Sequence, residues 1–208
     1  MASVHPSNHP LVLSKIAALR DVATAPAEFR RLVRVSAMLL AAEATTDLAM
    51  HSVEIETPLA RTSCPILAES VAIVPVLRAG LGMADGILDV IPEAEVWHIG
   101  LRRDEHTLLP EQYYTRVPNV AKVGLVLVVD PMLATGGSAA RACELVKACG
   151  ATRIKFLALL AAPEGIAHLT RAMPDIPIHV GAIDDRLNEV GFIYPGLGDA
   201  GDRQFATK

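Results

Sequence analysis

The order of apolar and polar positions along the chain predicts strands that alternate with helices. Strand-like apolar runs occupy residues 71–76, 95–101, 126–129, 155–162 and 178–183. Helical patterns cover residues 9–20, 26–48 and 139–149, and two further helices end at Val90 and Met173. The run 126–129 is wholly apolar and rich in valine, which is typical of a strand buried on both faces of a parallel sheet.

Residues 51–57 follow a different pattern, because apolar and charged side chains alternate there. Val53 and Ile55 would face one side of a strand, and Glu54 and Glu56 would face the other. This alternation predicts an exposed strand.

The sequence of two helices followed by strands alternating with helices predicts an α/β fold. Its core is a mostly parallel, twisted sheet flanked by helices on both faces. Ligands of such sheets bind at the carboxyl ends of the strands, so we expect the loops after Val76, Val129 and Ile183 to meet at one site. The length of 208 residues fits a single domain, residues 1–208.

Composition narrows the class of protein. Apolar residues make up 51% of the chain and aromatic residues only 4%, so the core must be aliphatic. The net charge of −4 and the lack of a basic run argue against a nucleic-acid partner. Pro, Gly or a charge interrupts every apolar window before it reaches the length of a membrane span, and the polar start of the chain lacks an apolar signal core. Three cysteines without metal-ligand spacing indicate reduced thiols and a cytoplasmic location.

The segment after the apolar run 126–129 has the composition of a phosphate-binding loop. Asp130 ends the run, a loop of small residues follows, and a helical pattern begins at Ala139. Gly136 and Gly137 would let the backbone approach a ligand, and the first N–H groups of the helix would point at an anion. Thr135 and Ser138 add hydroxyl donors, and an acid beside such a cradle typically holds a sugar hydroxyl or a bound metal.

Two further segments are candidates for the same site. Arg78 lies between an apolar strand and a loop containing Gly80, Gly82 and Gly86, which we interpret as a second backbone cradle with a guanidinium beside it. Residues 191–203 hold too many Gly and Pro residues for a helix or a strand, yet they contain large apolar side chains. We therefore expect an ordered loop that covers a ligand.

Three separated motifs resemble those of the uracil phosphoribosyltransferases, a type I phosphoribosyltransferase family. They are Asp-Pro-Met-Leu-Ala-Thr-Gly-Gly from Asp130, Val-Leu-Arg-Ala-Gly-Leu-Gly-Met from Val76, and Tyr-Pro-Gly-Leu-Gly-Asp-Ala-Gly-Asp-Arg from Tyr194. The resemblance implies a phosphoribosyltransferase-like fold with N-terminal helices at 9–48, a hairpin flap at about 102–115 and a C-terminal hood at about 184–208.

The resemblance also implies an activity and the residues that perform it. The reaction is transfer of phosphoribose from 5-phosphoribosyl 1-diphosphate (PRPP) to N1 of uracil, giving UMP and pyrophosphate in pyrimidine salvage. Arg78, Arg103 and Asp130 would be catalytic, and Ile193, Gly198, Asp199 and Ala200 would bind uracil. The PRPP-binding residues implied are Arg78, Arg103, Asp130, Pro131, Met132, Leu133, Ala134, Thr135, Gly136, Gly137, Ser138 and Asp199.

Further expectations come from the same resemblance. Mg²⁺ would be carried in with PRPP, without an assigned protein ligand. GTP is a candidate allosteric activator, as in some members of the family, and a homodimer or homotetramer is expected. At Arg102 and His106 the chain departs from the family pattern, which commonly has Tyr and an acid there, so the contribution of both residues is open.

Two other functions remain as alternatives at this point. One is a phosphoribosyltransferase for purines or orotate, which would be favoured if the tail did not cover the base. The other is an RNA-binding pyrimidine regulator on the same fold, which would need a basic face that the acidic net charge argues against.

Overall fold

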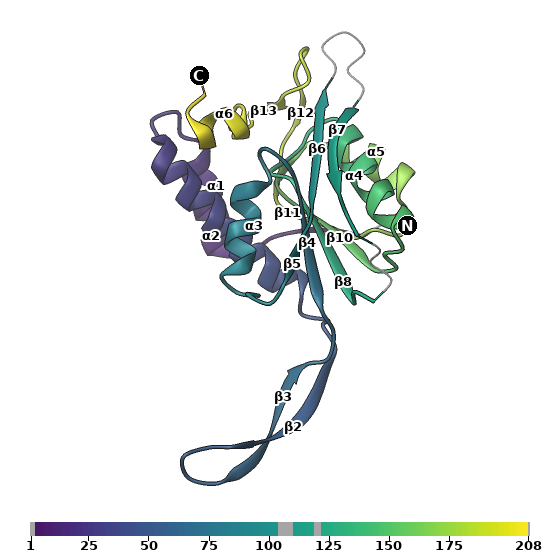
Figure 1. Cartoon of the computed structure of the whole chain (residues 1–208). Helices are drawn as coiled ribbons and strands as arrows, with labels where there is room; N and C mark the ends of the chain where they lie inside the picture. The colour runs from purple at the N-terminus through teal and green to yellow at the C-terminus, as the bar shows by residue number, and fades with distance from the viewer. Residues whose placement is uncertain (1–2, 104–109, 119–121, 208) are drawn as a thin grey trace.

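The computed structural model describes residues 3–103, 110–118 and 122–207, and at positions 102, 103 and 110 it describes the backbone alone. The central element is a twisted sheet flanked by helices on both faces (Figure 1). Its main strands, in spatial order, are β1 (Val4–Pro6), β11 (Ile178–Ile183), β10 (Ile154–Ala161), β8 (Leu125–Val129), β4 (Val71–Leu77), β6 (His98–Arg103) and β7 (Pro110–Arg116). Neighbouring strands run parallel except for the antiparallel pair β6–β7. The predicted α/β fold is confirmed.

The helices divide into two layers, one on each face of the sheet (Figure 1). One layer contains α1 (Pro10–Arg20), α2 (Pro26–Ala44) and α3 (Leu81–Leu88), and the other contains α4 (Gly137–Ala148) and α5 (Pro163–Ala172). Leu127 and Phe29 are buried in the core on the first side, whereas Val128 and Phe156 are buried on the second. Both faces of β8 are therefore covered, which explains its unbroken apolar sequence.

Three parts of the sheet differ from the predicted strands. The N-terminal strand β1 pairs with β11 from Val4 to Pro6 and extends the sheet beyond it. Residues 95–101 form two strands, β5 (Glu95–Val96) and the start of β6, because only Glu95 and Val96 pair before the chain moves on. The short strand β9 (Met132–Leu133) pairs with the end of β10 inside the predicted phosphate loop.

The exposed strand predicted at residues 51–57 is confirmed as β2 (Met50–Glu56). Its antiparallel partner β3 (Arg61–Leu67) was not predicted. Together they form a hairpin that projects away from the rest of the molecule (Figure 1).

The described strands of the flap, β6 and β7, extend toward the same end of the sheet as the hood (Figure 1). β6 and β7 pair from His98 with Arg116 to Arg103 with Pro110, as the predicted hairpin requires. The tip, residues 104–109, lies outside the described residues.

The hood contains β12 (Arg186–Leu187), β13 (Ile193–Tyr194) and α6 (Ala200–Phe205). The prediction that residues 191–203 form neither helix nor strand was therefore wrong. The side chain of Asp199 accepts a hydrogen bond from the N–H of Asp202 at 2.8 Å, and this N-cap favours a helix in a glycine-rich segment. Among the described residues, no helix is both long enough and apolar enough to cross a membrane.

Candidate active site

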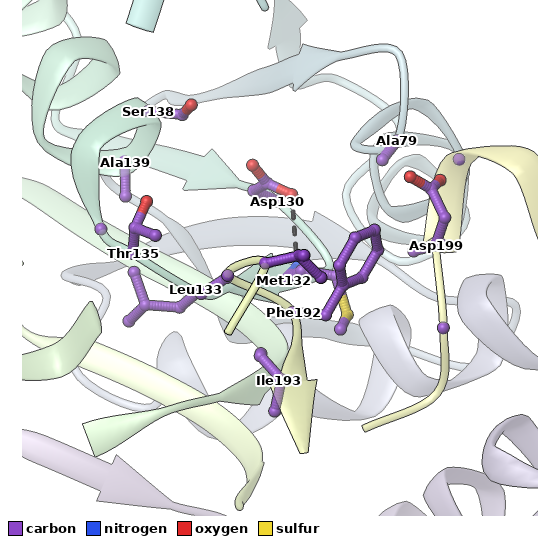
Figure 2. Close-up of a pocket in the computed structure, with 17 residues that line it drawn as sticks. Ala79, Asp130, Met132, Leu133, Thr135, Ser138, Ala139, Phe192, Ile193 and Asp199 are labelled. Carbon is purple, nitrogen blue, oxygen red and sulfur yellow. Dashed lines mark hydrogen bonds between the residues drawn. The ribbon is translucent and has the colours of Figure 1, made fainter. Parts of the chain in front are cut away.

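A cavity of about 620 Å³ lies between the carboxyl ends of the central strands and the hood (Figure 2). Its walls come from the loop after β4, the loop after β8, and the hood. The lining residues are Ala79, Asp130, Met132, Leu133, Ala134, Thr135, Gly136, Ser138, Ala139, Val190, Gly191, Phe192, Ile193, Gly198, Asp199, Ala200 and Gly201. The cavity therefore joins the predicted phosphate loop to the predicted base-binding residues.

The loop after β8 has the geometry of an anion cradle. Gly136 adopts a left-handed backbone with φ 82°, and a Cβ there would lie 2.7 Å from the carbonyl oxygen of Gly165. Glycine is thus required both for the turn and for the close approach of α5. The helix α4 starts at Gly137, and the first N–H groups of a helix have no partner within it. These donors and the positive end of the helix dipole can hold a phosphate beside Thr135 and Ser138.

Asp130 lies at the end of β8 with its carboxylate toward the cavity (Figure 2). Burial, together with the smaller effect of the negative charge of Asp199, raises the pKa of this carboxyl to about 7. The N–H of Met132 donates to Asp130 Oδ1 at 3.2 Å and works in the opposite direction. A carboxyl group with a pKa near 7 can accept a hydrogen bond from a sugar hydroxyl, or bind a cation, when either enters the cavity.

The hood is held in place by charged groups, of which Asp184 is buried. Asp184 is buried at the end of β11, where it pairs with Arg20 and accepts a hydrogen bond from the N–H of Gly196 at 2.8 Å. Arg20 also donates to the carbonyl of Gly196 at 2.9 Å. Asp184 is therefore structural, because both of its carboxylate oxygens already take part in fixing the hood.

A second arginine anchors the other side of the hood. Arg203 donates to the carbonyl of Leu197 at 2.9 Å and lies over the ring of Phe29, with 4.4 Å between the guanidinium carbon and the ring centroid. It also donates to the carbonyl of Asp21, beyond the end of α1. The hood is thus tied to the helical layer on one face of the sheet.

Arg78 lies outside the cavity lining, at the start of the loop that follows β4. Its side chain is 58% exposed, 3.8 Å from Asp202 Oδ1 and 5.9 Å from the centroid of the Phe205 ring. The neighbouring Ala79 does line the cavity. An exposed guanidinium next to the opening can reach an anionic ligand, because little of it is fixed by packing.

Two of the glycines that we interpreted as part of a second backbone cradle, Gly82 and Gly86, belong to a helix and not to a loop. Gly82 and Gly86 lie within α3, where an added Cβ would collide with the Gln204 side chain and with the backbone of Arg34, respectively. A Cβ at Gly80 would lie 2.6 Å from the carbonyl oxygen of Val129. These glycines allow close packing of α3 against its neighbours.

Several predicted site residues are not in the cavity wall. Pro131 is buried, and its carbonyl accepts hydrogen bonds from the N–H groups of Leu159 and Leu160 at 3.0 Å each. Gly137 starts α4 but does not line the cavity. Arg103 ends β6, and its side chain lies outside the described residues, as do the side chain of Arg102 and all of His106.

The cavity also contains residues that the sequence analysis did not select. Phe192 lines it with 43% of its surface exposed, and Val190 and Gly191 precede it in the wall. Figure 2 shows the Phe192 ring beside Met132. A half-exposed aromatic ring next to a thioether suits a planar ligand, and the only signal in the sequence was one Phe in an aromatic-poor chain.

No cluster of three or more His, Cys, Asp or Glu side chains able to hold a metal ion exists among the described residues. Asp130 and Asp199 are the carboxylates in the cavity lining. Two carboxylates fit an ion that keeps most of its ligands as water and substrate phosphate oxygens, which is how Mg²⁺ is usually held.

The chain matches a family model described as uracil phosphoribosyltransferase over residues 6–207. A uracil phosphoribosyltransferase from Roseiflexus sp. is 55% identical over 207 residues, and one from Clostridium perfringens is 53% identical over 209 residues. Both matches cover 100% of this chain and 100% of the relative.

Solved structures agree with the sequence relatives. A protein from Aquifex aeolicus superposes with a TM-score of 0.94 at 34% identity, covering 99% of both chains. A hypoxanthine-guanine phosphoribosyltransferase from Bacillus anthracis superposes with a TM-score of 0.52 at 17% identity, covering 81% of this chain and 83% of that one, which supports the shared fold alone. With this fold, this cavity and full-length relatives, the chain belongs to the uracil phosphoribosyltransferase family.

Proposed function

We propose that the cavity holds PRPP and uracil side by side, with PRPP along the loop 130–138 and uracil under the hood. In the reaction, a bond forms between N1 of uracil and C1 of the ribose while the bond from C1 to pyrophosphate breaks, and N1 gives up its proton, so that the products are UMP, pyrophosphate and a proton. The single observation that carries this placement is the cavity itself, which joins the α4 N-terminus to the hood backbone at Gly198 to Ala200.

The 5′-phosphate and ribose of PRPP are assigned to residues 130–138. The left-handed turn at Gly136 and the start of α4 support the phosphate position. Asp130, at the start of the loop, would accept hydrogen bonds from the ribose hydroxyls, which its position in the cavity lining supports. Arg78 and Arg103 are assigned to the departing pyrophosphate, where added positive charge stabilises the leaving group.

The reaction also requires stabilisation of the positive charge that develops on the ribose. Bond exchange at a sugar C1 passes through an oxocarbenium-like state. Asp130 and Asp199 line the cavity where that positive charge would develop, and preorganised negative charge in a partly dry site stabilises it. Neither residue has to act as a nucleophile.

Uracil is assigned to Ile193, Gly198, Asp199 and Ala200, with the ring beside Phe192. Backbone N–H and C=O groups of the hood can pair with the alternating acceptors and donor on the edge of uracil. The buried Asp184 and its partner Arg20 fix that backbone, so its N–H and C=O groups would meet the edge of uracil in set directions.

Mg²⁺ belongs to the proposal as an ion carried on PRPP. Bound there, it would neutralise charge on the pyrophosphate as that group leaves. Asp130 and Asp199 are the described side chains that fit such an ion, and both also face the ribose position.

Assembly, regulation and location complete the proposal. We expect a homodimer or homotetramer, because the projecting β2–β3 hairpin exposes Met50, Ile55, Ile66 and Leu67. GTP is proposed as an activator on family grounds alone. A cytoplasmic location fits the free thiols of Cys64, Cys143 and Cys149.

The experiment that tests the assignment is a product assay with purified protein, PRPP, uracil and Mg²⁺, with UMP and pyrophosphate measured separately. We expect both products in equal amounts, and loss of activity when Mg²⁺ is chelated. Pyrophosphate released without UMP would mean that the cavity hydrolyses PRPP and does not place a base beside it. Sedimentation and rates with added GTP test the assembly and the activator.

A further inference from the structure

A single buried side chain connects the two walls of the cavity. Gln204 lies in α6 and is 0% exposed. Its amide Nε2 donates to the carbonyl of Ala79, in the loop that follows β4, at 2.9 Å. The same nitrogen donates to the carbonyl of Ala200, at the start of α6, at 3.1 Å. Ala79 and Ala200 both line the cavity, so one amide group joins the pyrophosphate-side wall to the base-side wall.

The orientation of this amide is fixed by its surroundings. Both neighbours of the Gln204 nitrogen are carbonyl oxygens, and exchanging the nitrogen and the oxygen would bring three acceptors together. The remaining oxygen, Oε1, is buried without a hydrogen-bond partner among the described residues. It points at Gly82 of α3, where an added Cβ would collide with it.

An unpartnered buried oxygen is unfavourable for folding, because an apolar side chain of similar size would avoid it. A glutamine at position 204 is therefore explained by the two hydrogen bonds that its Nε2 donates. Two neighbouring contacts join the same loop to α6: Arg78 lies 3.8 Å from Asp202 Oδ1, and its guanidinium carbon lies 5.9 Å from the centroid of the Phe205 ring. The helix α6 thus contacts the pyrophosphate-side loop at three points.

We propose that Gln204 is a positioning residue that couples the pyrophosphate-binding loop to the uracil-binding hood. An anion that orders the loop at Ala79 orders Ala200 through the shared amide, and the base then meets a hood that is already set. The coupling is reciprocal, so uracil must favour anion binding by the same factor. This inference rests on the proposed assignment of pyrophosphate to the Arg78 loop and of uracil to the hood.

The test uses uracil and inorganic pyrophosphate, which cannot react with each other. Uracil affinity is measured by calorimetry for the full-length enzyme with and without saturating pyrophosphate. We expect pyrophosphate to strengthen uracil binding by about 5-fold or more in the unmodified enzyme, within the usual range of coupling between sites. In Gln204→Met, which keeps the volume but removes the donors, the factor should fall to about 1.

Two further variants separate positioning from simple stability. Arg30 donates to the backbone carbonyl of Gln204 at 2.6 Å, so Arg30→Met loosens α6 from α2 but leaves the amide bridge in place. It should lower the melting temperature and keep the coupling. Gly82→Ala should push the Gln204 amide aside from α3 without altering Gln204 itself, and it should lose the coupling. It also keeps the test available if Gln204→Met does not fold.

Different results would overturn the coupling role of Gln204 and the proposed assignment of substrates to the cavity. If the unmodified enzyme bound uracil and pyrophosphate independently, or if Gln204→Met or Gly82→Ala kept the full coupling factor, the coupling role would be overturned. If Arg30→Met lost the coupling as fully as Gln204→Met, Gln204 would be only an anchor of α6. If the unmodified enzyme bound neither ligand, the proposed substrate assignment would fail, and the coupling role with it.

Discussion

The carboxylate of Asp130, at the end of β8, and that of Asp199, at the N-cap of α6, face one cavity from two of its walls (Figure 2). The negative charge of Asp199 adds to burial in raising the pKa of Asp130 to about 7. Asp130 therefore changes its charge in the neutral range. Positive charge on a bound ribose, or an ion carried by the substrate, would favour its ionised form.

Asp130→Asn should stabilise the empty enzyme and inactivate it. The unfolded chain releases the Asp130 proton near pH 4, whereas the folded state holds it to about pH 7. The free energy of unfolding therefore falls as the pH rises from about 4 to about 7, and the loss is complete above that range. The variant should gain about 2–4 kcal/mol at pH 8 and almost nothing at pH 4.

Thermal melts of the unmodified enzyme and of Asp130→Asn between about pH 4 and pH 8 show whether the substitution stabilises the protein. The rate of UMP formation by the variant shows whether Asp130 is needed for catalysis. A destabilised variant at pH 8 would show that Asp130 is an ionised, partnered group in the empty protein. Full activity in the variant would remove Asp130 from the catalytic machinery.

Arg78→Met should lower kcat without lowering stability. The side chain is 58% exposed, so few packing contacts are lost. If it stabilises the leaving pyrophosphate, kcat should fall by about 10²–10³-fold, as for other transition-state donors. Arg34→Met is the matched control, because Arg34 is also half exposed and paired with an acid, Asp89, on the surface. A normal kcat in Arg78→Met would assign Arg78 to the α6 contact alone.

Asp184→Ala should loosen the hood. The change leaves the charge of Arg20 and the N–H of Gly196 without their partner in a buried setting. We expect a loss of about 2–4 kcal/mol in the free energy of unfolding and a larger rise in the KM for uracil than in the KM for PRPP. The exposed pair of Glu28 and Arg31 gives the control, since Glu28→Ala should leave melting unchanged. Equal rises in both KM values would mean that Asp184 supports the whole site and not the hood.

Gly136→Ala should weaken PRPP binding. Its left-handed backbone, φ 82°, and the carbonyl of Gly165 both oppose a Cβ, at a cost of about 1–3 kcal/mol for the backbone alone. Gly150, with φ 100° at the far end of α4, provides a control with the same strain away from the cavity. The KM for PRPP should rise at least about 10-fold in Gly136→Ala only. A similar rise in Gly150→Ala would point to general strain in α4.

The buried layer of the fold could be read from the sequence because its strands are apolar on both faces. β8 and β4 are covered by helices on each side, and their sequences are unbroken apolar runs. β3 gave no such signal, because both faces of the projecting hairpin are largely exposed and its residues are mixed in character. β1 is only three residues long and gains its order from pairing with β11, a distant part of the chain.

The candidate site also contains residues that could be predicted from the sequence and residues that could not. The loop at residues 130–138 is local, so its turn and helix start could be recognised from neighbouring residues. Phe192 and Ala79 lie in segments that were predicted to reach the site, but neither residue was selected, because which side chains of these segments line the cavity depends on tertiary contacts. Gly82 and Gly86 were predicted to lie in a ligand-binding loop, but they lie in α3. Glycine allows close packing of a helix as readily as close approach of a ligand, so the sequence does not distinguish the two.

The central claim is that the fixed backbone of the hood reads the edge of uracil. Steady-state rates with PRPP and each of uracil, cytosine, orotate and guanine measure this directly. Cytosine would set donors against donors and leave buried groups unpaired, at about 1–3 kcal/mol for each mismatch. We expect kcat/KM for uracil to exceed that for cytosine by about 10²–10⁴-fold, with orotate and guanine lower still. Comparable values for uracil and any of the other three bases would contradict the account.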